Sequence, residues 1–207
     1  CLMSQSLKFF VLAVFFCVGC NIAHAQKKDF QKGYLIAKNG DTLNGFVKDR
    51  TPEPFVSMYK KIRFQKEGTN RVRKFGPDTI LGYGYNGNDF ISVPFREEAR
   101  FFKFRYYSDT SAPKVFLRVV RRSANLVYFE QLSEQDDNNY LNTVPFFYKP
   151  FSQEMVRVTQ GLFGFRKKHL AEYFSDCSEL IQAVNRSNSE VESVMELYEF
   201  YHLNCVD

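Results

Sequence analysis

Residues 79–95 read TILGYGYNGNDFISVPF, and this stretch decides the fold class. Asn86-Gly87 is a preferred dipeptide of tight hairpin turns, because both residues accept the positive φ that such turns require. Apolar and aromatic residues lie on both sides of it. We therefore predict a β-hairpin, with one strand from Thr79 to Tyr85 and a return strand from Phe90 to Phe95.

The same stretch contains the letter pattern G-x-G-x-x-G at residues 82–87. A dinucleotide site needs this loop to open a helix whose N-terminus receives the pyrophosphate. Here the loop leads into Phe90-Ile91-Ser92-Val93, which is typical of a strand. The pattern is therefore interpreted as a hairpin turn, and no cofactor site is predicted.

Similar signals occur on both sides of this hairpin. Tyr34–Ala37 and Leu43–Lys48 flank another turn dipeptide, Asn39-Gly40. Further strand-like segments are Lys61–Gln65, Arg71–Phe75, Phe101–Tyr107, Val115–Val120, Leu126–Leu132, Val144–Tyr148 and Met155–Thr159. Because no helical pattern separates these segments, an antiparallel sheet is favoured over parallel βαβ units, in the form of a partly closed barrel or a sandwich.

The hydrophobic period changes after about residue 160. Apolar residues then recur at spacings of three and four, which is typical of helices. Asp176 followed by Glu179 predicts a break near Ser175, and Ser189 is a candidate cap for the last helix. We predict an α+β fold, with an antiparallel β-rich part over 30–160 and a C-terminal helical hairpin over 163–204 packed on the sheet.

The N-terminal residues are typical of an export signal. Lys8 is followed by an apolar run from Phe9 to Val18, and Ala23-His24-Ala25 fits a signal-peptidase site before Gln26. We predict a signal peptide over 1–25, cleavage between Ala25 and Gln26, and one globular domain over 26–207. The run is shorter than the about 20 residues of a membrane-spanning helix, so no transmembrane span is expected in the mature chain.

A second export route competes with this one. Cys17-Val18-Gly19-Cys20 resembles a lipobox, in which Cys20 would be lipidated, although Cys17 stands where leucine is usual. A lipid anchor would hold the domain at a membrane surface. The expected localisation is the periplasm or the outside of the cell, with a membrane-anchored lipoprotein as the alternative.

The charge balance is mildly basic. Cleavage after Ala25 removes one of the 28 basic residues, Lys8, and leaves 27 against 23 acidic residues, a net charge of +4. This balance does not call for nucleic acid, and none is expected as a partner. The basic clusters are interpreted as solvated faces rather than as a polyanion site. They are Lys60-Lys61, Arg71-Val72-Arg73-Lys74, Arg121-Arg122 and Arg166-Lys167-Lys168.

Two cysteines remain after cleavage, Cys177 and Cys205. Two antiparallel helices would bring Cys177, near the start of one, close to Cys205, just past the end of the other. In an oxidising compartment the two could pair, and closing this 28-residue loop would stabilise the fold by roughly 3–4 kcal/mol. Two buried free thiols are the alternative.

Recognisable catalytic and metal-binding patterns are missing from the sequence. His169 and His202 lack a partner at ligand spacing such as H-x-x-x-H, and we interpret them as structural histidines. The acidic run at 133–139 lacks the ligand spacing and central glycine of a calcium loop. No G-x-S-x-G turn occurs. We predict no catalytic, cofactor-binding or metal-binding residues.

Two distant parts of the chain together resemble a known group. They are KGYLI at 32–36 with NGDTLNG at 39–45, directly after the signal segment, and YFSDC at 173–177 with the terminal pair Asn204-Cys205. This arrangement resembles uncharacterised exported proteins of Bacteroidetes-type bacteria. The resemblance implies an envelope setting and supports a Cys177–Cys205 disulfide, but it implies no activity.

Two functions are left open by these observations. The first is a non-enzymatic domain that binds an unknown envelope or extracellular partner through an aromatic sheet face, although core packing also explains the aromatic cluster Phe101, Phe102, Tyr106 and Tyr107. The alternative is a hydrolase acting on envelope glycan or peptide with a carboxylate pair such as Asp78 and Asp89. A concave site with convergent polar groups is what the hydrolase would require.

Overall fold

The computed structural model describes residues 29–50, 60–100, 103–134, 141–151, 154–159, 164–185 and 191–205. The predicted signal segment with Cys20, Ala25 and Gln26 lies outside these residues, as do Phe101, Phe102 and 135–139 of the acidic run. The chain divides into two compact units, Cys1–Phe30 and Gln31–Asp207. All the helices and strands named below belong to the second unit.

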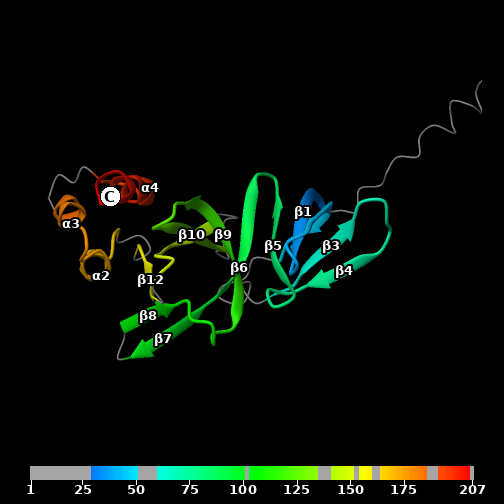
Figure 1. Cartoon of the computed structure of the whole chain (residues 1–207), viewed down its shortest axis with the longest axis horizontal. Helices are drawn as coiled ribbons and strands as arrows, with labels where there is room; N and C mark the ends of the chain where they lie inside the picture. Colours follow the sequence, from blue (N-terminus) through cyan, green and yellow to red (C-terminus); the bar gives the residue numbers. More distant parts are fainter. Residues whose placement is uncertain are drawn as a thin grey trace, which may run out of the picture. The chain divides into compact units, whose positions relative to one another are not determined.

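Twelve strands in the described residues form one antiparallel sheet (Figure 1). Their order across the sheet is β4-β3-β2-β1-β5-β6-β9-β10-β11-β12-β8-β7. Their bounds are β1 Gln31–Ala37, β2 Thr42–Lys48, β3 Ile62–Lys66, β4 Val72–Phe75, β5 Ile80–Tyr85, β6 Asn88–Pro94, β7 Arg96–Arg100, β8 Lys103–Tyr107, β9 Lys114–Arg122, β10 Val127–Glu134, β11 Leu141–Tyr148 and β12 Glu154–Arg157. The α+β prediction is confirmed, with an open sheet rather than a closed barrel.

The hairpin over residues 79–95 is confirmed as β5 and β6. Asn86 and Gly87 adopt φ values of 49° and 73°, as a tight turn requires. Gly82 pairs with Ile91, and a Cβ added to Gly82 would lie 2.5 Å from the carbonyl oxygen of Phe90. In the G-x-G-x-x-G pattern, Gly82 therefore allows two strands to approach closely, and Gly87 forms part of the turn.

Strand β6 runs on through Phe95 into β7, which lies at one edge of the sheet (Figure 1). One hydrophobic core is formed by residues of β6, β8, β9, β10, β11 and β12 together with Phe95. In this core the ring centroid of Phe95 lies 5.8 Å from that of Tyr106 and 5.5 Å from that of Phe146. A second core lies under β1, β2, β3 and β5, around Leu35 and Tyr83.

Strands β10 and β11 are buried on both faces. Val127, Phe129 and Phe146 belong to the core that contains Phe95, whereas Tyr128 and Phe147 belong to a further core beneath the helices. Burial on both sides explains why these segments are apolar at successive positions instead of alternating.

In the described residues, three helices pack on the face of the sheet that carries Tyr128 and Phe147. They are α2 Lys167–Tyr173, α3 Ser178–Asn185 and α4 Val194–Asn204 (Figure 1). The first part of the expected helical hairpin consists of two helices, α2 and α3. The break between them, from Phe174 to Cys177, lies where it was predicted. Ser193, rather than the expected Ser189, caps α4, because it forms a reciprocal capping box with Glu196. In the described part of the chain, no helix combines the length and hydrophobicity that a bilayer crossing requires.

Cys177 and Cys205 form a disulfide, with Cα atoms 5.5 Å apart. The bond joins the break before α3 to the end of α4, as the antiparallel arrangement predicts. It closes a loop that contains both helices.

Candidate functional site

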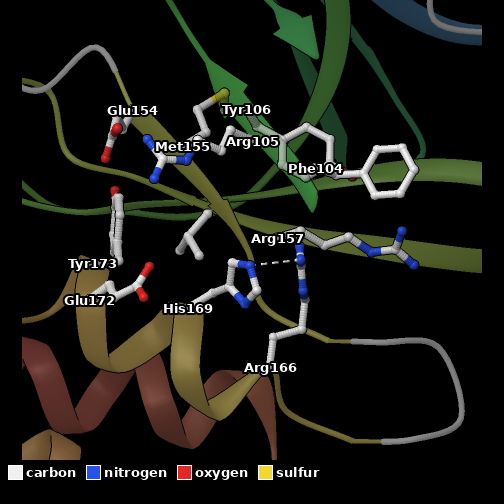
Figure 2. A pocket seen from close by; sticks show the side chains of 11 residues that line it. Phe104, Arg105, Tyr106, Glu154, Met155, Arg157, Arg166, His169, Glu172 and Tyr173 are labelled. Atoms are coloured by element: carbon white, nitrogen blue, oxygen red, sulfur yellow. Dashed lines mark hydrogen bonds between the residues drawn. The ribbon is translucent and has the colours of Figure 1, made fainter. Parts of the chain in front are cut away.

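A cavity of about 210 Å³ lies where β8, β12 and α2 meet (Figure 2). Its lining combines charged, aromatic and apolar side chains. They are Phe104, Arg105, Tyr106, Glu154, Met155, Val156, Arg157, Arg166, His169, Glu172 and Tyr173.

One strand pairing that is distant in sequence and one local chain reversal assemble this cavity. β12 pairs with β8 so that Met155 lies opposite Tyr106, about fifty residues earlier in the chain. After β12 the chain returns, and the backbone N–H of Arg166 donates to the carbonyl oxygen of Val158 at 2.9 Å. This return places Arg166 beside the end of β12, and α2 then brings His169 to the same side.

Arginine side chains dominate one end of the cavity. Arg166 Nη2 lies 3.1 Å from His169 Nε2, and in Figure 2 the side chain of Arg157 passes the guanidinium of Arg166 before its own guanidinium extends away from His169. The Nε of Arg157 is buried without a hydrogen-bond partner. Among the described residues, no carboxylate forms a salt bridge with either arginine.

Burial and neighbouring positive charge lower the pKa values of two side chains at this end, Arg166 and His169. Burial lowers the pKa of Arg166, and the nearby charge of Arg157 adds to this effect. Burial, followed by the charge of Arg166, lowers the pKa of His169. The imidazole is therefore neutral near pH 7. Because a guanidinium only donates, Nε2 of His169 is the acceptor and Nδ1 carries the proton.

The opposite end carries the two carboxylates and a phenol. Glu154, Glu172 and Tyr173 lie together on this side in Figure 2. The hydroxyl of Tyr173 is buried and has no hydrogen-bond partner. Arg105 belongs to this end electrostatically, because Tyr107 and then the charges of Glu154 and Glu172 raise its pKa.

The cavity therefore has an uneven charge distribution. Among the described residues of its lining there are three arginines against two glutamates, and His169 is neutral. Since Arg105 faces the glutamates, the surplus positive charge lies at Arg157 and Arg166. A guanidinium group matches the geometry of a carboxylate or phosphate, so this end can hold an anion.

Asp78 and Asp89, the example of a carboxylate pair considered for a hydrolase, do not come together. Asp89 pairs with Gly84 near the β5–β6 turn, whereas Asp78 precedes the other end of β5. Asp89 accepts a hydrogen bond from the Tyr34 hydroxyl at 2.5 Å. The two carboxylates lie at opposite ends of the β5–β6 hairpin and cannot share a substrate bond.

The predicted aromatic cluster is also divided. Tyr106 packs in the core, and Tyr107 lies under the guanidinium of Arg96 at 5.1 Å. Phe104, which is 41 % exposed, is the aromatic side chain of β8 that faces solvent at the cavity.

The two histidines differ in their surroundings. His169 lines the cavity, which the sequence did not predict, whereas His202 stacks on Tyr198 with ring centroids 6.4 Å apart. In the ranges that the structure describes, no group of three or more histidine, cysteine or acidic side chains could hold a metal ion.

Comparisons with protein-family models, with curated proteins and with solved structures find no match to this chain. The chemistry of the cavity therefore carries the functional argument. Its key residues, Arg157 and Arg166, gave one signal in the sequence, the basic cluster Arg166-Lys167-Lys168.

Proposed function

We propose that this chain is an exported, non-enzymatic binding domain that holds the anionic end of a ligand between Arg157 and Arg166. The observation that carries the proposal is the buried Arg157 Nε, which has no partner and lies beside a second arginine. A buried N–H group without a hydrogen-bond partner is costly, although the Arg157 side chain also hydrogen-bonds to Tyr106. A carboxylate or phosphate in the cavity would offset that cost with two or more charge-assisted hydrogen bonds.

The size of the cavity supports a small binding group. Pockets for drug-sized ligands span roughly 300–1,000 Å³, and this cavity measures about 210 Å³. It suits one sugar ring or one amino-acid residue, such as the end of a longer envelope or extracellular molecule. The exposed ring of Phe104 offers an apolar surface, and Glu154 and Glu172 offer acceptors for hydroxyl groups.

The other features of the chain are consistent with an exported protein. The Cys177–Cys205 disulfide suits an oxidising compartment. Together with the signal-like segment at 1–25, it supports periplasmic or extracellular localisation, with a lipid anchor on Cys20 as the alternative.

The test compares two sugars that differ by one carboxylate. Glucuronate and glucose are titrated into the mature domain by isothermal calorimetry and by ¹H–¹⁵N NMR. We expect saturable binding of glucuronate, with shifts centred on Arg157, Arg166 and His169, and no saturable binding of glucose. Inorganic phosphate should compete with glucuronate. Equal behaviour of the two sugars, or shifts that centre elsewhere, would refute the proposal.

Matched variants locate the effect. Arg166→Gln should weaken glucuronate binding by about tenfold, because the loss of a charge-assisted hydrogen bond costs about 1.5 kcal/mol or more. Arg122→Gln removes the same charge from an exposed position on β9 and should leave the affinity unchanged. Similar losses in both variants would indicate a general charge effect instead of a site.

A hydrolase remains the second candidate, because Glu154 and Glu172 line the same cavity. Both residues are exposed, whereas a carboxyl that acts as a general acid near neutral pH is typically buried. Binding is therefore favoured. Release of reducing ends from envelope glycan, abolished by Glu154→Gln and Glu172→Gln but not by Glu192→Gln, would reverse this preference.

A further inference from the structure

Three cationic side chains lie directly opposite one another across β2, β3 and β4, far in sequence from the arginine cavity. Lys48 pairs with Arg63, and Arg63 pairs with Lys74. Adjacent strands are about 4.8 Å apart, so the three positions form a row about 10 Å long. Like charges at directly opposed positions, such as those of Arg63 and Lys74, destabilise a sheet.

The buried residues on the other face of the same strands hold the three cationic residues in position. Val47, Ile62 and Phe64 alternate with the cationic residues and are buried in the core beneath. A shift in register would expose these apolar side chains, so the core fixes the positions of the cations. The row is therefore rigidly presented by a buried framework.

Further cations surround the row. Lys48, Arg63 and Lys74 line a hollow of about 340 Å³ together with Asp49, Arg50, Lys60 and Lys61. Lys61 and Lys74 come from two of the basic clusters of the sequence, which the fold brings together.

The acidic side chain in this lining is already engaged. Asp49 accepts hydrogen bonds from the hydroxyls of Tyr83 and Tyr85 at 2.6 and 2.9 Å and from Arg50 Nε at 3.2 Å. Within the described ranges, no carboxylate forms a salt bridge with Lys61, Arg63 or Lys74. The described part of the chain therefore does not neutralise the positive charge of these three residues.

We propose that this surface, the Lys48–Arg63–Lys74 row, binds an oligoanion that carries phosphate or sulfate groups about 5 Å apart, such as a sulfated or phosphorylated oligosaccharide. Compact, multiply charged groups suit a cluster of lysines, which act as point charges. Among the described residues of this lining there is no aromatic side chain on which a nucleobase could stack, which argues against single-stranded nucleic acid. This surface is independent of the arginine cavity and would operate whether or not that cavity binds a ligand.

The test measures the affinity of the mature domain for a sulfated tetrasaccharide and for tripolyphosphate at 150 mM salt. The double variant Arg63→Gln/Lys74→Gln should lose at least tenfold in affinity for each probe that binds. The control Lys66→Gln/Arg73→Gln lies on the same two strands, removes the same charge and projects from the opposite face. It should stay within about twofold of the parent domain, and thermal unfolding verifies that both variants are folded.

The outcomes separate the alternatives. Binding of tripolyphosphate with this variant pattern supports the surface and identifies a phosphate chain as the source, whereas binding of the tetrasaccharide alone supports it and identifies a glycan. Equal losses in both double variants would overturn the proposal, because they indicate attraction by net charge. Hexaglutamate, a carboxylate oligoanion, is the control probe. The proposal would also be overturned if hexaglutamate bound as tightly as the other probes, or if none of the probes bound.

Discussion

Lys149 donates hydrogen bonds to both carboxylate oxygens of Asp176, at 2.6 and 2.7 Å. Its ammonium also lies 5.1 Å from the ring centroids of Tyr173 and Phe174 and 5.2 Å from that of Tyr201. Lys149 directly follows β11, and Asp176 lies in the break between α2 and α3. The pair therefore fastens the helices, including the one that carries His169, to the sheet.

Replacement of Lys149 by methionine should lower the free energy of unfolding by about 1–2 kcal/mol. The variant keeps an apolar stem but loses the ion pair and the attraction to three aromatic rings. Urea unfolding measures the change. Lys168→Met, which removes an exposed charge from α2, should stay within about 0.5 kcal/mol of the parent. Equal losses in the two variants would contradict this role of Lys149.

The same pair predicts a pH dependence. Burial alone would raise the pKa of Asp176, but hydrogen bonds from Lys149 and Tyr201 outweigh it and hold the pKa below 3.8. A carboxyl with a lowered folded-state pKa stabilises the fold above its unfolded value, near 3.9, and loses that contribution as the pH falls through the folded value. Asp176→Asn should therefore reduce the difference in stability between pH 6 and pH 2.5. An unchanged difference would show that another group controls the acid limb.

Loss of the Cys177–Cys205 disulfide should destabilise the domain by roughly 3–4 kcal/mol on the chain-entropy model. Urea unfolding of the parent with and without a reductant measures this effect. The double variant Cys177→Ser/Cys205→Ser should resemble the reduced parent and should not respond to reductant. A parent domain whose midpoint is insensitive to reduction would refute a stabilising bridge.

Gly82 tests the assignment of the G-x-G-x-x-G pattern to strand contact. Gly82→Ala places a Cβ 2.5 Å from the backbone oxygen of Phe90, which cannot move without breaking the hairpin, and should cost about 1–3 kcal/mol. Gly76→Ala is the control, because its Cβ would have no neighbour closer than 3.5 Å. Thermal unfolding should separate the two variants. If Gly82→Ala were as stable as the control, close strand contact would not explain this glycine.

Local signals were sufficient to predict most of the fold. Asn39-Gly40 and Asn86-Gly87 predicted two hairpins that the structure contains, because a dipeptide that favours positive φ acts over a few residues. Strand β7 was missed. Its sequence, Arg96 to Arg100, is REEAR, and such charged residues are typical of edge strands, which lack one neighbour and are hard to distinguish from loops.

The candidate site could not be predicted in the same way. Arg157 and Arg166 come close because the chain reverses after β12, and Arg105 reaches the opposite end of the cavity because β8 pairs with a strand about fifty residues later. Neither pairing has a local sequence signal. The carboxylates considered from sequence, Asp78 and Asp89, fail for the same reason, because strand order decides which side chains converge.

The most direct test of the account is an NMR titration of the His169 imidazole against pH. Without ligand, burial and the charge of Arg166 keep its pKa below 6.5. An anion held between Arg157 and Arg166 adds negative charge beside the ring and favours its protonated form. We predict that glucuronate raises the pKa of His169 and that glucose leaves it unchanged. A pKa that is the same with both sugars at saturating concentration would contradict anion binding in this cavity.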